Sequence, residues 1–244
     1  MTIRTAICTL FLVATAIMAG PVAHAEQSLT ISTGEYAPFT DSSVVGGGTV
    51  NAIVSQIAEK SGLTAQFEYM PWMRALELTR VGRFDATSFW YFSAERKPEF
   101  IHVGPVLHDR LVFFRRADMP DQSWEELEDL SAFKIGAVTG YTYAPEFWQY
   151  ADEDRIDVEI APDDEANLRK LLAGRIDLYP MSEQVGRRLI ETKFSKADQA
   201  RFAVISKPLI VTEGYLLVSR AIEGADALAA RLQEAVDTLD PVTN

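Results

Sequence analysis

Two aromatic residues and an arginine lie close enough together to recognise a small organic acid. Trp90 and Tyr91 end a run typical of a buried strand, and Arg96 follows in the turn after it. A guanidinium group binds a carboxylate through two parallel hydrogen bonds, and aromatic faces enclose apolar or planar groups. In an open α/β sheet the carboxyl ends of the strands face the ligand crevice. The stretch from Phe84 to Arg96 therefore predicts one wall of a binding site.

Motifs for other kinds of chemistry are weak in this chain. It contains neither a Gly-x-Ser-x-Gly elbow nor a His-Glu-x-x-His pair. His102 and His108 lie six positions apart in an expected strand and turn, which is a poor spacing for a metal pair. Glu165 and Glu183 are candidate acids or bases, but both positions are more typical of a solvated helix face. We therefore predict no catalytic residue, no metal and no cofactor.

The first residues have the pattern of a cleavable export signal. Arg4 precedes an almost entirely apolar run from Ala6 to Ala19, and Ala23-His24-Ala25 fits the small-x-small cleavage rule. The run is too short and wrongly flanked for a membrane-spanning helix. Residues 1–25 are thus predicted to be a signal peptide, cleaved after Ala25, which places the mature chain in the periplasm. The single cysteine lies within this segment, so the mature chain is expected to carry no thiol.

The net charge of the chain limits the kinds of partner that it is suited to bind. The net charge of the 244-residue chain is −12, and the mature chain loses Arg4 and becomes more acidic. A strongly acidic protein is poorly suited to nucleic acid or to an anionic membrane surface. Its length is sufficient for one large domain or two modest ones. No later segment is apolar for long enough to span a bilayer.

Strand-like and helix-like segments alternate along the mature chain. This alternation is typical of parallel α/β sheets with helical cover, and the strand–helix unit occurs from residue 29 and again from residue 134. Two lobes with a crevice between them are the natural outcome. The segment His108-Asp109-Arg110 is interpreted as a turn between two strands. Strands are expected at 29–32, 65–69, 101–107, 111–116, 134–138, 156–160, 176–179, 202–205 and 214–219, and helices after Gly48, from Trp72, at 124–130, around 147–148, from Asp164, from Ser182 and at 225–239.

Several segments, in this order and spacing, resemble the periplasmic solute-binding proteins of family 3. These proteins usually serve polar amino-acid ABC transporters. Taken alone, Arg96 would be assigned to a surface ion pair with Glu95 or Glu99. The resemblance therefore depends on the order and spacing of the whole set of segments. The matching segments are Tyr36-Ala37-Pro38-Phe39, Trp72 with Gly82-Arg83-Phe84-Asp85, Ser93-Ala94-Glu95-Arg96, 100–106, 134–140, 172–177 and 214–220.

The resemblance implies a two-lobe periplasmic binding protein fold of type II. Each lobe would be a mostly parallel sheet covered by helices, with the ligand cleft between the lobes. Residues 26–107 and 212–244 would form a discontinuous first lobe, and residues 108–211 the second. The crossing segments are predicted near Leu107–Arg110 and Pro208–Thr212. The lobes would close on the ligand by bending at this hinge.

The resemblance also implies where a ligand binds. The carboxylate-binding arginine of the family falls on Arg96, its aromatic platforms on Tyr36 and Trp72, and its second-lobe contact on the loop from Thr139 to Thr142. Backbone N–H groups of this loop and the guanidinium group would hold an anionic group from two sides. The predicted ligand-binding residues are Tyr36, Trp72, Trp90, Tyr91, Arg96, Thr139, Gly140, Tyr141, Thr142, Ser182 and Glu183.

The chain departs from the family pattern at two places. Amino-acid binders usually have an aspartate for the ligand's ammonium group where this chain has Ser182, and Glu183, Glu165 or Glu35 are possible substitutes. They also have small polar residues where this chain has Trp90-Tyr91-Phe92, whose bulk suits a ligand with an apolar or planar part. The chain therefore looks closer to an aromatic-rich branch of the family.

The function implied by the resemblance is capture of a small solute that bears a carboxylate. The solute would be an amino acid or a related compound, handed to an inner-membrane ABC permease by a monomeric binding protein. Ligand sensing on the same fold is an alternative. An enzyme similar to the cyclohexadienyl dehydratases is a second and less favoured alternative, since it needs an acid or base at the crevice.

Overall fold

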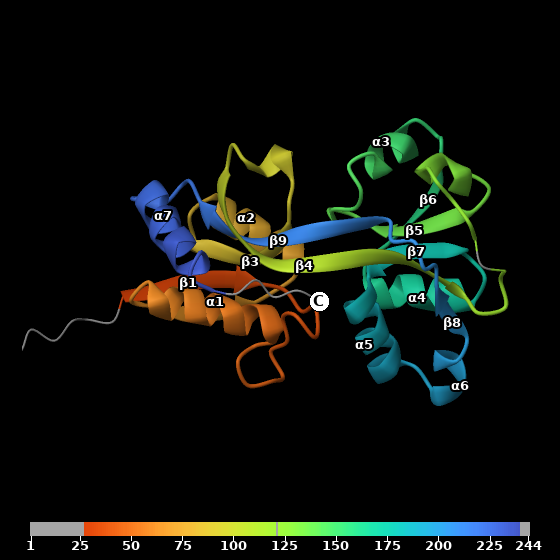
Figure 1. Cartoon of the computed structure of the whole chain (residues 1–244), viewed down its shortest axis with the longest axis horizontal. Helices are drawn as coiled ribbons and strands as arrows, with labels where there is room; N and C mark the ends of the chain where they lie inside the picture. The colour runs from red at the N-terminus through yellow and green to blue at the C-terminus, as the bar shows by residue number, and fades with distance from the viewer. Residues whose placement is uncertain (1–26, 121, 240–244) are drawn as a thin grey trace, which may run out of the picture.

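The computed structural model describes residues 27–120 and 122–239. The predicted signal peptide lies outside the described residues. The described chain forms two lobes joined by a pair of long strands (Figure 1). Within these residues, none of the helices has both the length and the apolar character needed to cross a membrane.

The first lobe contains the beginning and the end of the described chain. Parallel strands β1 and β2 lie beside β3, which is parallel to β1, and helices cover both faces (Figure 1). Helix α1 buries Val50, Val54, Ile57 and Ala58, a spacing that places all four on one helix face. The elements are β1 (Gln27–Thr33), α1 (Thr49–Lys60), β2 (Leu63–Tyr69), α2 (Trp72–Arg80), β3 (Ala86–Tyr91), the 3₁₀ helix η1 (Ala94–Arg96) and α7 (Ala225–Val236).

The second lobe repeats the strand–helix arrangement. Strand β5 is parallel to both β6 and β7, and α4 begins with Asp163 as its N-cap, whose carboxylate accepts a hydrogen bond from the Ala166 N–H at 2.8 Å. The elements are η2 (Leu127–Leu130), β5 (Lys134–Val138), α3 (Phe147–Asp152), β6 (Asp157–Ala161), α4 (Asp164–Leu172), β7 (Leu178–Ser182), α5 (Glu183–Lys193), α6 (Lys196–Gln199) and β8 (Phe202–Val204).

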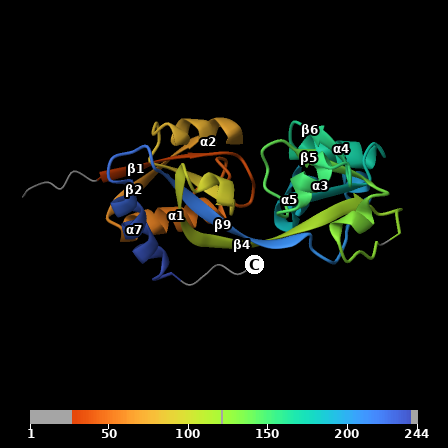
Figure 2. The same ribbon diagram turned by 90° about the horizontal axis from the view of Figure 1, so that it is seen from above.

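Two antiparallel strands, β4 (Phe100–Arg116) and β9 (Ile210–Ser219), run between the lobes. They join both halves into one sheet of order β2-β1-β3-β9-β4-β7-β5-β6, with β8 beside β4. Figure 2 shows this pair along one side of the molecule, with the lobes facing each other beside it. The predicted crossing segment at Leu107–Arg110 lies within β4, and the one at Pro208–Thr212 runs into the start of β9. The division of the lobes at residues 107/108 and 211/212 stays a prediction.

One expected turn is in fact part of a strand. The sequence analysis placed a turn at His108-Asp109-Arg110, which was wrong, because β4 continues through these residues. His108, Asp109 and Arg110 pair with residues 213, 212 and 211 of β9. Since the paired strand satisfies their backbone groups, polar residues that usually favour a turn are held extended. The side chain of Asp109 is thereby buried at the junction of the lobes, with 2% of the residue exposed.

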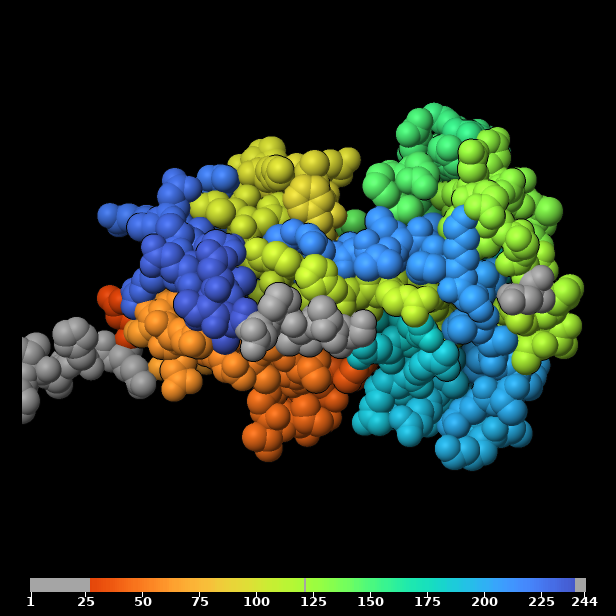
Figure 3. Space-filling view, viewed as in Figure 1, coloured from red at the N-terminus to blue at the C-terminus, as the bar shows by residue number. Residues whose placement is uncertain are grey.

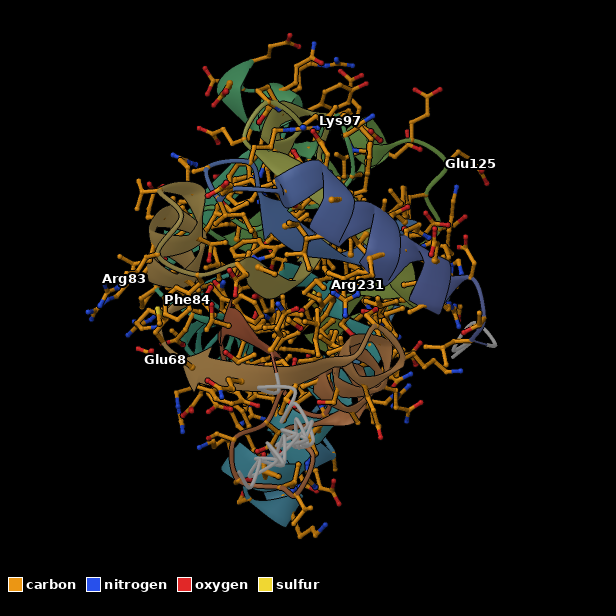
Figure 4. All side chains as sticks on the ribbon, turned by 90° about the vertical axis from the view of Figure 1, so that its left-hand side faces the viewer. Glu68, Arg83, Phe84, Lys97, Glu125 and Arg231 are labelled. Atoms are coloured by element: carbon orange, nitrogen blue, oxygen red, sulfur yellow. The ribbon has the colours of Figure 1, made fainter. Side chains whose placement is uncertain are left out.

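Apolar packing is continuous between the lobes. One cluster of buried residues includes Ile31 and Val54 of the first lobe together with Leu171 and Val185 of the second, and another surrounds Phe113 and Phe147 in the second lobe. The space-filling view shows the lobes meeting across the β4–β9 pair (Figure 3). Figure 4 views the molecule from the end of the first lobe, where α7 lies in front. The charged side chains of Glu68 and Arg83 lie at one edge of this view.

Candidate functional site

A cavity of about 50 Å³ lies where the two lobes face each other. This space is sufficient for only a few water molecules, so a ligand of amino-acid size requires the lobes to separate. The cavity contains most of the predicted binding residues and one residue, Phe89, that was not predicted. It is lined by Tyr36, Trp72, Phe89, Trp90, Tyr91, Gly140, Tyr141 and Thr142.

The wall residues follow the carboxyl ends of parallel strands from both lobes. In the first lobe, Tyr36 follows β1, Trp72 follows β2 and Tyr91 ends β3. In the second lobe, Gly140 and Tyr141 follow β5. Side chains separated by more than 100 residues meet because the carboxyl ends of parallel strands lie at the same edge of a sheet.

The indole ring of Trp72 rests on a glycine. Trp72 is the first residue of α2, and its Nε1–H donates a hydrogen bond to the Glu35 carbonyl oxygen at 3.3 Å. A Cβ atom added at Gly34 would lie 2.4 Å from Cε2 of Trp72. Only glycine therefore lets the indole ring approach the backbone after β1 closely enough to line the cavity.

The rings of the cavity wall meet edge to face. Trp72 contacts Trp90 with ring centroids 5.3 Å apart, and Tyr36 of the first lobe contacts Tyr141 of the second at 6.3 Å. Among the pairs formed by these described wall rings, the interplanar angles run from 51° to 89°. Edge-to-face pairs are favourable aromatic contacts, so the wall is stable as it stands and offers no parallel pair to sandwich a planar group.

Arg96 lies beside this cavity and bridges the lobes. Its guanidinium group is 4.7 Å from the centroid of the Trp90 ring, and Nη1 donates to the Tyr91 carbonyl oxygen at 3.3 Å. Nη1 and Nη2 also donate to Oγ1 of Thr142 at 3.2 Å and to the Gly140 carbonyl oxygen at 3.5 Å, both in the second lobe. The guanidinium group is thus held toward the cleft by neutral acceptors.

Arg96 has no carboxylate partner among the described ion pairs of the chain. Desolvation by burial lowers its pKa to about 10, against a smaller opposing effect of Glu95. The group stays positively charged at neutral pH, and a partly desolvated cation is stabilised by an anion. The surface ion pair considered for Arg96 is therefore not what the chain forms.

Two buried carboxylates lie behind the ring wall, each bonded to a tyrosine of that wall. The Tyr91 hydroxyl donates to Oδ2 of Asp109 at 2.7 Å, and the Tyr141 hydroxyl donates to Oδ2 of Asp164 at 3.2 Å. Asp164 also accepts a hydrogen bond from the hydroxyl of Tyr179. Burial raises the pKa of Asp109 and raises that of Asp164 to about 6, although the tyrosine hydrogen bonds act in the opposite direction.

Besides Arg96, three predicted residues lie outside the cavity wall. Thr139 is exposed and lines the wider cleft mouth instead. Ser182 is fully buried, caps α5 by accepting a hydrogen bond from the Val185 N–H, and shares a hydrogen bond with Asp109. Glu183 pairs with Arg187 at 2.6 Å and with Arg110 at 3.6 Å. Their assignment as ligand contacts stays a prediction.

Sequence reasoning missed Phe89, Asp109 and Asp164. Asp109 matters most, because its carboxylate contacts Ser182, the position at which the resemblance expects an aspartate. The available signal was its register in β4, where Leu111 lies opposite Ser182 of β7. That pairing could have been found only if the expected turn at residues 108–110 had been read as a strand.

The fold is that of two-lobe periplasmic binding proteins. A histidine kinase sensor domain similar to such proteins superimposes with a TM-score of 0.72 at 20% identity, over 87% of this chain and 90% of that one. An ancestral arginine-binding protein bound to arginine gives 0.70 at 19% identity, over 88% and 92%. The GluR0 ligand-binding core from Nostoc punctiforme, in complex with L-glutamate, gives 0.66 at 15% identity, over 85% and 91%.

Neither a protein-family model nor a curated protein sequence matches the chain. At identities of 20% and below, the structural likeness defines the architecture alone. The similar structures are solute-binding or ligand-sensing domains, some of which hold amino acids.

Proposed function

We propose that this protein captures a small solute bearing a carboxylate group between its lobes in the periplasm and delivers it to an inner-membrane ABC importer. The observation that carries the proposal is Arg96, a charged guanidinium group beside an aromatic cavity with no acidic partner among the described ion pairs. A carboxylate offers a stronger hydrogen-bond partner than the carbonyl oxygen of Gly140 at 3.5 Å. The solute would be an amino acid or a related zwitterion.

Closure of the lobes would complete the site. Arg96 and Tyr36 of the first lobe contact Thr142 and Tyr141 of the second lobe. A solute would therefore enter between separated lobes, bind Arg96, and touch both lobes once they close on it. Its differential affinity for the closed form would shift the chain toward closure, with bending in β4 and β9. We take the chain to be monomeric, with residues 1–25 removed on export.

Ligand sensing is the second candidate function, and the likeness to a histidine kinase sensor domain favours it. The similar structures are binding or sensor proteins, which favours a binding role over catalysis. Uptake of a radiolabelled solute separates the two candidates. Deletion of the gene should abolish uptake if the protein serves an importer, whereas a sensor would leave uptake unchanged.

A thermal-shift screen tests the binding proposal. The mature chain is heated with a library of small carboxylates, each paired with its amide or decarboxylated analogue. A solute at 100 times its dissociation constant should add about 2.7 kcal/mol of stability. We expect carboxylates to stabilise the chain and their neutral partners to fail. A set of hits that is indifferent to the carboxylate would contradict the proposal.

Alanine at Gly140 is expected to weaken solute binding by up to about fivefold. A Cβ atom at this second-lobe residue would lie 2.5 Å from Sδ of Met73 on α2 of the first lobe. The Met73 side chain is flexible and exposed, so it can move aside in part. The overlap therefore costs at most about 1 kcal/mol, and it arises only where the lobes meet. Isothermal titration should show the loss of affinity, and small-angle scattering should show incomplete contraction on addition of solute.

Gly224→Ala is the matched control. Gly140 and Gly224 have φ angles of +81° and +72°, so alanine is strained at both, but a Cβ atom at Gly224 meets nothing within 4 Å. The unfolding free energy of both variants should fall by about 1 kcal/mol. Only Gly140→Ala should also lose affinity for the solute. Equal affinities for the two variants would show that the contact between Gly140 and Met73 does not form during closure.

A further inference from the structure

The cavity wall is suited to a positively charged group. Six aromatic side chains line it, and the faces of tryptophan, tyrosine and phenylalanine attract cations. Because the rings meet edge to face and offer no parallel pair, the wall suits a compact head group better than a flat ring once the lobes separate to admit it. The lining residues are Tyr36, Trp72, Phe89, Trp90, Tyr91 and Tyr141, with Gly140 and Thr142.

The buried carboxylates strengthen this preference. The Tyr91 hydroxyl of the first lobe donates to Asp109 at 2.7 Å, and the Tyr141 hydroxyl of the second lobe donates to Asp164 at 3.2 Å. A phenol that donates to a carboxylate becomes more electron-rich, because hydrogen bonds in series polarise one another. Asp109 and Asp164 also place two carboxylates one hydroxyl away from the cavity. A cation among the rings would offset this buried negative charge.

The charge of the cleft mouth, which includes the Asp164 carboxylate behind the cavity wall, points the same way. This wider opening between the lobes is lined by four carboxylate side chains, and Arg169 is the basic residue among its lining residues. Arg169 is itself paired with Glu165 at 2.6 Å. A cleft lined by one sign of charge concentrates solutes of the opposite sign. The four acidic residues are Glu35, Asp163, Asp164 and Glu165.

The wall suits an alkylated ammonium group better than a primary one. A primary ammonium group carries three N–H donors, and each needs an acceptor once it is buried. The wall is made mainly of aromatic rings, and the hydroxyl hydrogens of Tyr91 and Tyr141 are directed to carboxylates behind the wall. N-methyl groups need no acceptor and spread the positive charge over a surface that packs on aromatic faces.

We infer that the cavity binds the compact, N-methylated ammonium group of a small zwitterion whose carboxylate lies on Arg96. This inference rests on the proposed function, since it assigns the other end of the same solute. Arg96 lies 4.7 Å from the ring of Trp90, which also lines the cavity. The two charges of the solute are therefore separated by a short spacer, as in an N-trimethylated α-amino acid.

Isothermal titration of the mature chain with two isosteric probes tests the inference. Trimethylammonioacetate (glycine betaine) and 3,3-dimethylbutanoate share shape and carboxylate, and differ in the positive charge. We expect glycine betaine to bind roughly 30-fold more tightly, the ratio expected for one desolvated cation–π contact. Equal or tighter binding of 3,3-dimethylbutanoate overturns the inference and leaves the proposed function standing. Failure of both probes, while other carboxylates bind in the thermal-shift screen, also overturns the inference alone.

Asp109→Asn tests the role of the buried charge. Asparagine keeps an acceptor for the Tyr91 hydroxyl and removes the negative charge. The variant should bind 3,3-dimethylbutanoate as the parent chain does and lose several-fold affinity for glycine betaine, so that the ratio of the two affinities falls. A general structural defect would weaken both probes equally, and an unchanged ratio would exclude a contribution from Asp109. The comparison of probes on the parent chain stands even if this variant does not fold.

Discussion

Replacement of Arg96 by alanine is expected to weaken the binding of a carboxylate solute by at least about 100-fold. Removal of one partner of a desolvated, hydrogen-bonded charge pair costs about 3 kcal/mol or more. In the thermal-shift assay, solute that stabilises the parent chain should leave the variant almost unchanged. Arg96→Lys should restore part of the affinity, because an ammonium group keeps the charge and loses the bidentate fork.

Lys97→Ala is the matched control for this prediction. Lys97 is the next residue, carries the same charge and is exposed, with its ammonium group 5.1 Å from the centroid of the Phe92 ring. Its removal changes the net charge by the same amount, and we expect an affinity within about twofold of the parent value. If Arg96→Ala and Lys97→Ala behave alike, general electrostatics explains the binding and Arg96 is not the anchor.

We also expect the unfolding free energy of the chain to fall as pH rises, because of the buried carboxyl group of Asp164. Burial raises the pKa of Asp164 to about 6 from its ordinary value of 3.8. Between these two values the folded chain retains a proton that the unfolded chain has lost, so the unfolding free energy falls as pH rises. The contribution of Asp164 to the unfolding free energy is on the order of 3 kcal/mol. It is fully present below about pH 4 and is lost by about pH 7. Urea unfolding at a series of pH values should show the decline.

Asp164→Asn should flatten that part of the curve, because asparagine does not titrate. Asp163→Asn is the control, since Asp163 is the N-cap of α4 and asparagine caps helices about as well as aspartate. The difference between the parent chain and Asp164→Asn should therefore change with pH, and the difference for Asp163→Asn should stay nearly constant. A constant difference for Asp164→Asn would show that its carboxyl group is not desolvated.

The sequence predicts the architecture well because the signals are local. Apolar spacing in α1 and the cap residue Asp163 of α4 each depend on a few neighbouring residues. The aromatic wall was also predictable in large part, because Tyr36, Trp72 and Tyr91 lie just after or at the ends of strands. The carboxyl ends of parallel strands meet at the crevice in any fold of this type.

The charged groups behind the wall could not be predicted in the same way. Asp109 is buried because β9 pairs with β4 through the expected turn, and that pairing joins residues about 100 positions apart. Asp164 was identified as part of a helix start, and its burial against Tyr179 depends on how β7 packs beside β5. Long-range register therefore decided which carboxylates stand near the cavity, and short-range patterns do not report register.

The most direct test of the central claim is a crystal structure of the mature chain with the tightest carboxylate solute from the screen. We predict that the solute lies between the lobes, with its carboxylate oxygens about 2.7–2.9 Å from the guanidinium nitrogens of Arg96, and that the rings of Tyr36, Trp72 and Tyr141 enclose its other end. A solute bound elsewhere, or one whose carboxylate points to solvent while Arg96 keeps its bonds to Gly140 and Thr142, would contradict the account.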